Sequence, residues 1–171
     1  MKKILMVIDM QNDFISGALG SEEARRIVPA VVDAVNGFDG EVIFTRDTHF
    51  ENYAETQEGK KLPVAHCIKD SHGWQVCDEL MKTDAYKKSR IIDKLSFGSE
   101  ELGELMKELR PDEVYVTGLC TDICVISNVM IIRAFSPETN ITVYEKCCAG
   151  VTPESHRTAL DAMKMCQVDI V

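Results

Sequence analysis

The sequence predicts an α/β protein with three layers: a doubly wound, mostly parallel β-sheet with helices on both of its faces. Two observations lead to this fold class. Segments of strand type alternate with segments of helical spacing along most of the chain, and the strand segments are continuous apolar runs. Such runs are typical of a sheet that is covered on both sides. In a sheet of this kind, a ligand site is expected at the carboxyl ends of the strands.

The first part of the chain contains two predicted strands and one predicted helix. Residues 3–9 (KILMVID) and 41–46 (EVIFTR) are short apolar runs of the buried-strand type. Between them, residues 22–36 have helical spacing, and Gly37 stands where a helix would end. These segments therefore predict one strand-helix-strand unit.

The second part of the chain repeats this alternation. A helix is expected to end before Pro111, and Thr152-Pro153 is typical of an N-cap followed by proline in the first turn. The predicted helices cover residues 99–109, 122–135 and 153 to about 166, and the predicted strands cover 91–93, 114–118, 141–144 and 168–171. No internal repeat interrupts this order, so residues 1–171 are expected to form a single domain.

The segment from Thr48 to Ser89 differs from the rest of the chain. It is polar, has no clear periodicity and is rich in Glu, Lys and His. Long connections of this kind are often functional. We therefore expect this segment to contribute to a site.

Composition excludes several classes of protein. A length of 171 residues suffices for one ordinary domain, and a net charge of -9 argues against a nucleic-acid partner. No run approaches the roughly 18 apolar residues of a membrane helix, and the run after Lys3 is too short for a signal peptide. Seven cysteines are an odd number that does not suggest a disulfide scaffold. A cytoplasmic protein is the simplest expectation.

Three residues with chemically useful side chains follow predicted strands. Asp9 closes the first strand, Lys94 follows Ile91-Ile92-Asp93, and Cys124 lies where a strand turns into a helix. An adjacent ammonium and a helix start would both favour the thiolate of a cysteine. A carboxylate can accept the thiol proton and return it to a leaving amine, and backbone N–H groups can hold an oxyanion.

Each of these residues alone also has a structural explanation. A carboxylate after a strand is usually a turn or cap residue, and a lysine is usually a solvated surface charge. A cysteine in an apolar helix usually packs, and Cys120 and Cys124 could also be metal ligands at helical spacing. The residues themselves leave these alternatives open.

Three motifs resemble those of the isochorismatase-like cysteine hydrolases, in the order of that family. They are VIDMQNDF around Asp9, DKLSFGS around Lys94 and GLCTDICV around Cys124. The resemblance covers essentially the whole chain and implies the isochorismatase-like hydrolase fold with a catalytic triad of Asp9, Lys94 and Cys124. It also implies a non-proline cis peptide at Leu119–Cys120 and an oxyanion hole made by the backbone N–H groups of Cys120 and Cys124.

The presence of Cys124 separates this chain from the true isochorismatases, which lack the nucleophilic cysteine. The resemblance therefore implies hydrolysis of an amide through a thioester intermediate. Nicotinamide is the expected substrate and nicotinate the product, which would serve NAD salvage. The alternatives are a related amidase that acts on another small amide or a carbamoyl compound, and a non-catalytic binding protein on the same fold.

A second group of residues suits a metal ion. Asp47 and His49 follow the second predicted strand, and His66 lies in the irregular segment. One carboxylate and two imidazoles suit zinc, iron or manganese, although an Asp-x-His can also be a hydrogen-bonded turn. In the nicotinamidase branch of the family, these positions bind a divalent metal that holds the pyridine nitrogen. Glu58 is the best-placed further ligand, and Glu55 is a second candidate.

The remaining expectations concern the pocket and the assembly. Phe14 and Trp74 are candidates for the apolar walls of a pocket for a flat ring, although either can equally belong to the core. His72 and His156 are interpreted as surface or packing histidines. The segment after Asp-x-His lacks the Trp-His-Pro motif that is usual in nicotinamidases, which weakens the inference about substrate. By analogy with the family, a homo-oligomer is conceivable.

Overall fold

The computed structural model describes every residue from Met1 to Val171. At its centre lies a six-stranded sheet with the order β3-β2-β1-β4-β5-β6, in which all neighbouring strands are parallel. The strands are β1 (Lys3–Ile8), β2 (Glu41–Asp47), β3 (Arg90–Lys94), β4 (Glu113–Leu119), β5 (Asn140–Ala149) and β6 (Asp169–Ile170). The doubly wound α/β class is therefore confirmed.

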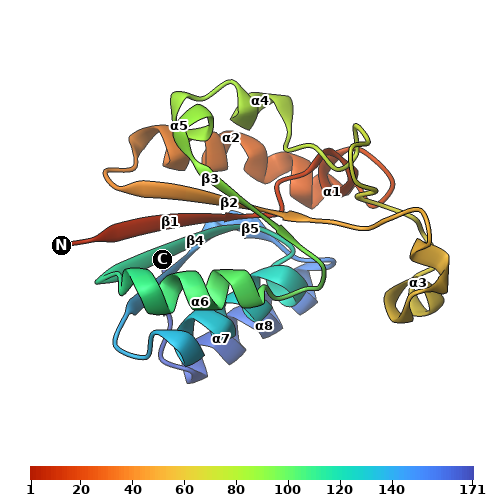
Figure 1. Ribbon diagram of the computed structural model, residues 1–171. Helices are drawn as coiled ribbons and strands as arrows, with labels where there is room; N and C mark the ends of the chain where they lie inside the picture. The colour runs from red at the N-terminus through yellow and green to blue at the C-terminus, as the bar shows by residue number, and fades with distance from the viewer.

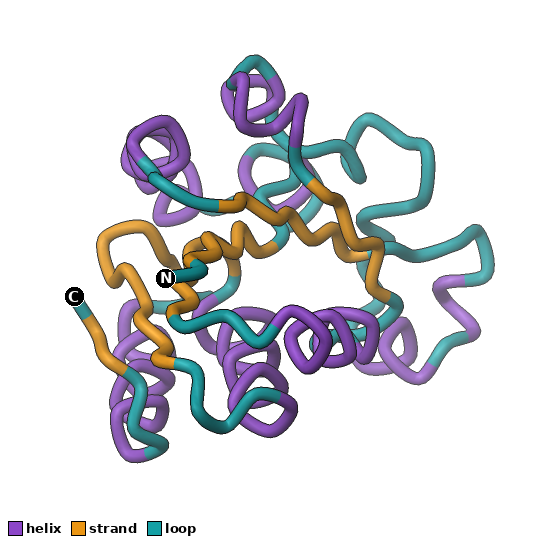
Figure 2. Tube along the Cα trace, turned by 60° about the vertical axis from the view of Figure 1, so that its left-hand side comes forward, coloured by secondary structure: helices purple, strands orange, loops and turns teal.

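Helices cover both faces of this sheet (Figure 1). One face carries α2 (Glu22–Gly37), α4 (Asp78–Met81) and α5 (Asp84–Lys88), and the other carries α6 (Glu100–Leu109), α7 (Ile126–Phe135) and α8 (Pro153–Met165). Figure 2 shows the strands running between these two layers. The short helices α1 (Asn12–Ile15) and α3 (Gln57–Lys61) lie beyond the carboxyl ends of the strands.

Two apolar cores hold the layers together, one on each face of the sheet. Alternate side chains of β1 point to opposite faces, so Ile4 and Met6 belong to a core of 20 buried residues and Leu5 and Val7 to a core of 17. All four are fully buried. Each such side chain contributes roughly 1.5 to 3 kcal/mol by burial. Continuous apolar strands are therefore explained by two cores rather than one.

The predicted elements differ from the observed ones mainly in the connections. The segment 48–89 is not free of helices, because it contains a 3-10 turn at Tyr53–Glu55 as well as α3, α4 and α5. These helices have three to five residues, so they are too short to show helical periodicity. The sequence marks the starts of α3 and α5 by N-cap residues, since the side chains of Thr56 and Thr83 each accept a backbone N–H.

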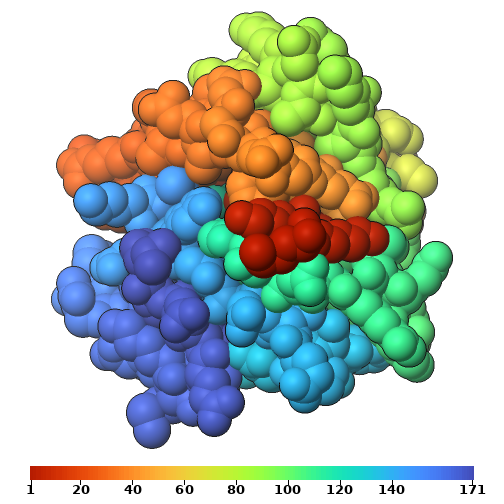
Figure 3. Space-filling model, turned by 90° about the vertical axis from the view of Figure 1, so that its left-hand side faces the viewer, coloured from red at the N-terminus to blue at the C-terminus, as the bar shows by residue number.

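The other differences concern element ends. Residues 121–125 form a π-helical turn before α7 instead of the first turn of one regular helix. Strand β5 extends to Ala149, well beyond the predicted end at residue 144. None of the helices combines the length and apolarity needed to cross a membrane. Figure 3 shows the face at the amino ends of the strands, on which the red and the dark blue end of the chain are both visible.

Candidate active site and adjacent metal-binding group

Asp9 lies directly after β1, at the carboxyl edge of the sheet. Its backbone is left-handed, with φ of 48°, and its side chain is fully buried. The Thr45 hydroxyl of the neighbouring strand β2 donates to Asp9 Oδ1 at 2.6 Å, and the Asp9 N–H donates to the Thr45 carbonyl at 3.3 Å. Two adjacent strands thus fix the direction of this carboxylate.

Lys94 is the last residue of β3, and its ammonium lies at the centre of the site. Its Nζ is 2.7 Å from Asp9 Oδ2, 3.0 Å from Asp47 Oδ1 and 3.4 Å from Cys124 Sγ. It also donates to the Ser96 carbonyl at 3.0 Å. Lys94 is almost completely buried, so it is an internal cation that ion pairs compensate rather than a solvated surface lysine.

Cys124 lies in the π-helical turn that follows β4. The peptide bond between Leu119 and Cys120, at the start of this turn, is cis, as the resemblance implied. Among the backbone hydrogen bonds of turns, loops and caps, none is donated by the Cys120 N–H. Asn128 of α7 donates to the Cys124 carbonyl at 2.8 Å. The site thus joins residues from the ends of three different strands, because Lys94 contacts both Asp9 and Cys124.

The burial of these groups shifts their protonation. Burial raises the pKa of the Cys124 thiol well above its ordinary value, and Asp9 adds to this, while Lys94 acts in the opposite direction. Burial likewise raises the pKa of Asp9 against the opposing charge of Lys94. Lys94 therefore favours the thiolate, as expected, but burial outweighs its charge, so the net shift of the Cys124 pKa is upward.

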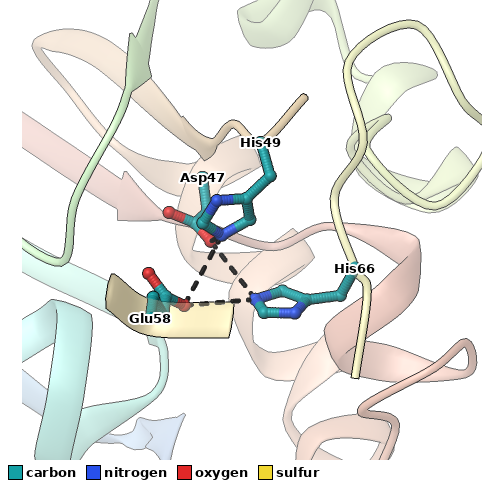
Figure 4. A group of neighbouring side chains, drawn as sticks. All are labelled: Asp47, His49, Glu58 and His66. Atoms are coloured by element: carbon teal, nitrogen blue, oxygen red, sulfur yellow. Dashed lines mark ion pairs between the residues drawn. The ribbon is translucent and has the colours of Figure 1, made fainter. Parts of the chain in front are cut away.

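Asp47, His49, Glu58 and His66 point toward one another in Figure 4. Their ligand atoms all lie within 4.8 Å of one another. The Asp47 Oδ2 is 2.9 Å from His49 Nε2 and 3.6 Å from His66 Nε2, and Glu58 Oε1 is 3.5 Å and 3.6 Å from the same two nitrogens. This group could hold a metal ion, and it contains Glu58 rather than Glu55.

The donor atoms of this group fit a metal ion. His49 Nε2 is buried without any hydrogen-bond partner, although Asp47 is near. His66 Nδ1 contacts the Val64 carbonyl at 2.8 Å, which orients Nε2 toward the other three side chains. Burial disfavours the charged ring of His49, but the carboxylates of Asp47 and Glu58 outweigh it and raise the pKa of His49 to about 9. A bound cation would replace that proton as the charge partner of both carboxylates.

One carboxylate joins the two groups. Asp47 Oδ2 faces the imidazoles, while its Oδ1 accepts from Lys94 at 3.0 Å. Burial would raise the pKa of Asp47, but the imidazoles and Lys94 hold it well below its ordinary value. The cation-binding group and the Asp9–Lys94–Cys124 group are thus neighbours in one electrostatic network.

A cavity of about 690 Å³ opens between the two groups and solvent. Phe14 lines it, as expected, together with Cys120 and Cys124. Trp74 does not line it, so that expectation is wrong. The indole is buried, stacks under the Arg46 guanidinium and donates its N–H to Thr48 at 2.9 Å. Trp74 therefore supports the segment after β2 from behind.

Several supporting residues were missed by the sequence argument. Gln11 is fully buried, and its amide exchanges two hydrogen bonds with the Asp47 backbone, at 2.7 and 2.8 Å. Asp13 accepts the N–H of Cys67, the residue after His66, at 2.7 Å. Both lie in the motif that contains Asp9, and their polar side chains next to a buried strand were the available signal. His72 is exposed, as expected.

Comparisons with known proteins agree with this geometry. The nicotinamidase of Saccharomyces cerevisiae is 27% identical over 168 residues, which covers 72% of this chain and 77% of that protein. An uncharacterized isochorismatase family protein of Bacillus subtilis is 29% identical, covering 94% of this chain and 93% of its own length.

Solved structures have the same fold over nearly the full length. The nicotinamidase/pyrazinamidase of Bacillus subtilis has a TM-score of 0.87 at 27% identity, with both chains fully covered. The pyrazinamidase of Pyrococcus horikoshii in complex with zinc has a TM-score of 0.85 at 25% identity, covering 100% of this chain and 99% of the other. A model of the isochorismatase domain matches residues 3–171, so this protein belongs to the isochorismatase domain family.

Proposed function

We propose that this protein is a cysteine amidohydrolase that converts nicotinamide to nicotinate and ammonia. The observation that carries the proposal is the buried meeting of Asp9, Lys94 and Cys124 beside a four-residue group that suits a metal ion. Relatives that are named nicotinamidases support the choice of substrate. A role in returning nicotinamide to NAD follows from that reaction.

In the first half of the proposed reaction, the Cys124 sulfur attacks the amide carbon while its proton passes to Asp9. The raised pKa of the buried thiol favours proton transfer during the attack over a thiolate that is present beforehand. Lys94, 3.4 Å from the sulfur, stabilises the negative charge that develops there. The backbone N–H groups of Cys120 and Cys124 are proposed to hold the oxyanion.

The second half of the reaction returns the site to its starting state. The carbon–nitrogen bond breaks, ammonia leaves with the proton that Asp9 carried, and a thioester to Cys124 remains. Asp9 then takes a proton from a water molecule, whose oxygen attacks the thioester carbon. The carboxylic acid leaves, and the thiol regains its proton. The raised pKa of Asp9 suits a group that accepts and returns protons in this way.

Asp47, His49, Glu58 and His66 are proposed to hold a divalent metal. Zinc is the preferred ion, because a pyrazinamidase of the same fold is described in complex with zinc, although two imidazoles and two carboxylates also suit iron or manganese. When bound, such an ion offers a Lewis acid for the ring nitrogen of the substrate. Phe14, whose ring centroid lies 5.5 Å from that of His66, supplies an apolar wall beside it.

A related amidase that acts on another small amide is the second candidate. It is favoured by the sequence after Asp47, where Thr48 and Phe50 stand in place of the motif that is usual in nicotinamidases. The deciding experiment is ammonia release from nicotinamide and from a panel of aliphatic and carbamoyl amides, with bound metal measured on the same sample. We expect nicotinamide to be the best substrate and the sample to contain one divalent ion per chain. Turnover of the aliphatic amides alone would favour the second candidate.

A further inference from the structure

The turn that contains Cys124 is held by side chains from two directions. On one side, Asn128 of α7 donates to the Cys124 carbonyl at 2.8 Å and accepts the Ser99 N–H at 3.0 Å. The other side faces α8, and its contacts have no part in the proposed reaction.

The first contact with α8 joins Thr121 to His156. Thr121 opens the π-helical turn, next to Cys120, and its side chain is fully buried. Its hydroxyl oxygen lies 2.7 Å from His156 Nδ1. Burial lowers the pKa of the half-buried His156, and the tautomer of its ring decides which of the two atoms donates the hydrogen bond. This hydrogen bond joins two elements that are 35 residues apart.

The second contact lies at the start of the same helix. Both carboxylate oxygens of Asp122 accept the Val151 N–H, at 3.1 and 3.2 Å. Gly150 packs so closely on His156 that a Cβ at Gly150 would lie 2.8 Å from the His156 Cβ. Gly150 and Val151 also line the cavity. The turn, the cavity wall and the first turns of α8 therefore form one connected unit.

We propose that His156 is a positioning residue that, through Thr121, fixes the turn presenting the Cys120 N–H and the Cys124 thiol to the substrate. The proposal rests on the hydrolysis proposed above. It adds a polar contact to the interpretation of His156 as a surface or packing residue, because this ring meets a buried hydroxyl. Small displacements of a nucleophile cost large factors in rate, so one hydrogen bond at this place has a kinetic effect.

The test compares four variants on nicotinamide. We expect His156→Ala and Thr121→Val each to lower kcat about tenfold or more, with KM changed less than twofold, because the loss concerns alignment rather than binding. His156→Asn should recover most of kcat, since its side-chain amide can take the place of Nδ1 as the partner of the Thr121 hydroxyl. Thr158→Ala is the matched control on the same helix, because its hydroxyl bonds only the Glu154 carbonyl, and it should behave as wild type.

A double variant and a structural measurement complete the test. If Thr121 and His156 act through one hydrogen bond, the double variant should lose little more than either single variant. Hydrogen exchange of residues 119–125 should rise at least tenfold in His156→Ala, while β1 stays protected. An unchanged kcat, a parallel rise in KM, an Asn variant no better than Ala, or unchanged exchange would each overturn the proposal. If exchange rises in His156→Ala but the wild type hydrolyses no amide, the positioning role stands and the proposed function is refuted.

Discussion

The two groups at the carboxyl edge of the sheet are built in different ways. Asp9 and Lys94 lie at the ends of β1 and β3, which both pair with β2, and Cys124 lies in a turn that two helices hold. Of the metal-binding group, only Asp47 belongs to a strand, whereas His49, Glu58 and His66 come from the segment 48–89. The nucleophile thus depends on the sheet, and the metal-binding group depends on loops and on the ion that would hold them together.

Removing the nucleophile should give the largest effect and separate the two groups. Cys124→Ala should lower amide hydrolysis by a factor of about 10⁴ or more, because no other group can form the thioester. The same variant should keep its bound metal, since Cys124 is not one of the four proposed ligands. Ammonia release and elemental analysis measure both quantities. Turnover that survives in this variant contradicts the mechanism.

Removing the ammonium of Lys94 should cause the largest loss of unfolding free energy. Lys94→Gln leaves the buried carboxylate of Asp9 without its ion-pair partner and removes one of the partners of Asp47, and breaking a buried ion pair typically costs about 3 to 5 kcal/mol of unfolding free energy. Urea unfolding at neutral pH measures this loss. The matched control is Lys107→Gln, whose exposed ion pair with Glu104 should contribute less than about 1 kcal/mol. Equal losses in both variants would contradict the role of Lys94 as the internal cation.

Removing one imidazole should affect the loop-built group alone. His66→Ala should lower the affinity for zinc by a factor of about 100 or more, because a site of four ligands loses one of its nitrogen donors. The arrangement of Asp9, Lys94 and Cys124 should stay unchanged, since His66 is not part of either apolar core. Competition with a chromogenic chelator gives the affinity. His72→Ala, an exposed histidine in the same segment, is the control that should bind zinc normally.

The smallest expected effect concerns the support of that loop. Asp13 accepts the Cys67 N–H at 2.7 Å and the Ala18 N–H at 3.2 Å, and so holds the residue after His66 in place. Asp13→Asn removes the charge from both hydrogen bonds and should lower zinc affinity about tenfold, the usual effect of a residue behind a ligand. Zinc titration by calorimetry measures it. A change as large as that of His66→Ala would mean that Asp13 itself binds the ion.

The difference between the two groups also explains what the sequence could predict. Strand ends are predictable, because β1 and β2 are continuous apolar runs, and the motifs around Asp9, Lys94 and Cys124 have a family order. The choice of Glu58 over Glu55 depends on the single turn of α3, which has no periodicity to detect. The position of Trp74 depends on its packing against Arg46, a contact between residues 28 positions apart. The net pKa shift of Cys124 depends on burial, which only the assembled cores determine.

The placement of the chain ends has a practical consequence. Both coloured ends of the chain are visible on the face at the amino ends of the strands (Figure 3), whereas residues that follow the carboxyl ends of strands, among them His49, Cys124 and Val151, line the cavity. A polypeptide fused to either end, or a solid support coupled there, would therefore leave the entrance open to the medium. Immobilised enzyme should keep the KM of the free form, whereas coupling through lysines beside the entrance, such as Lys61, should hinder access.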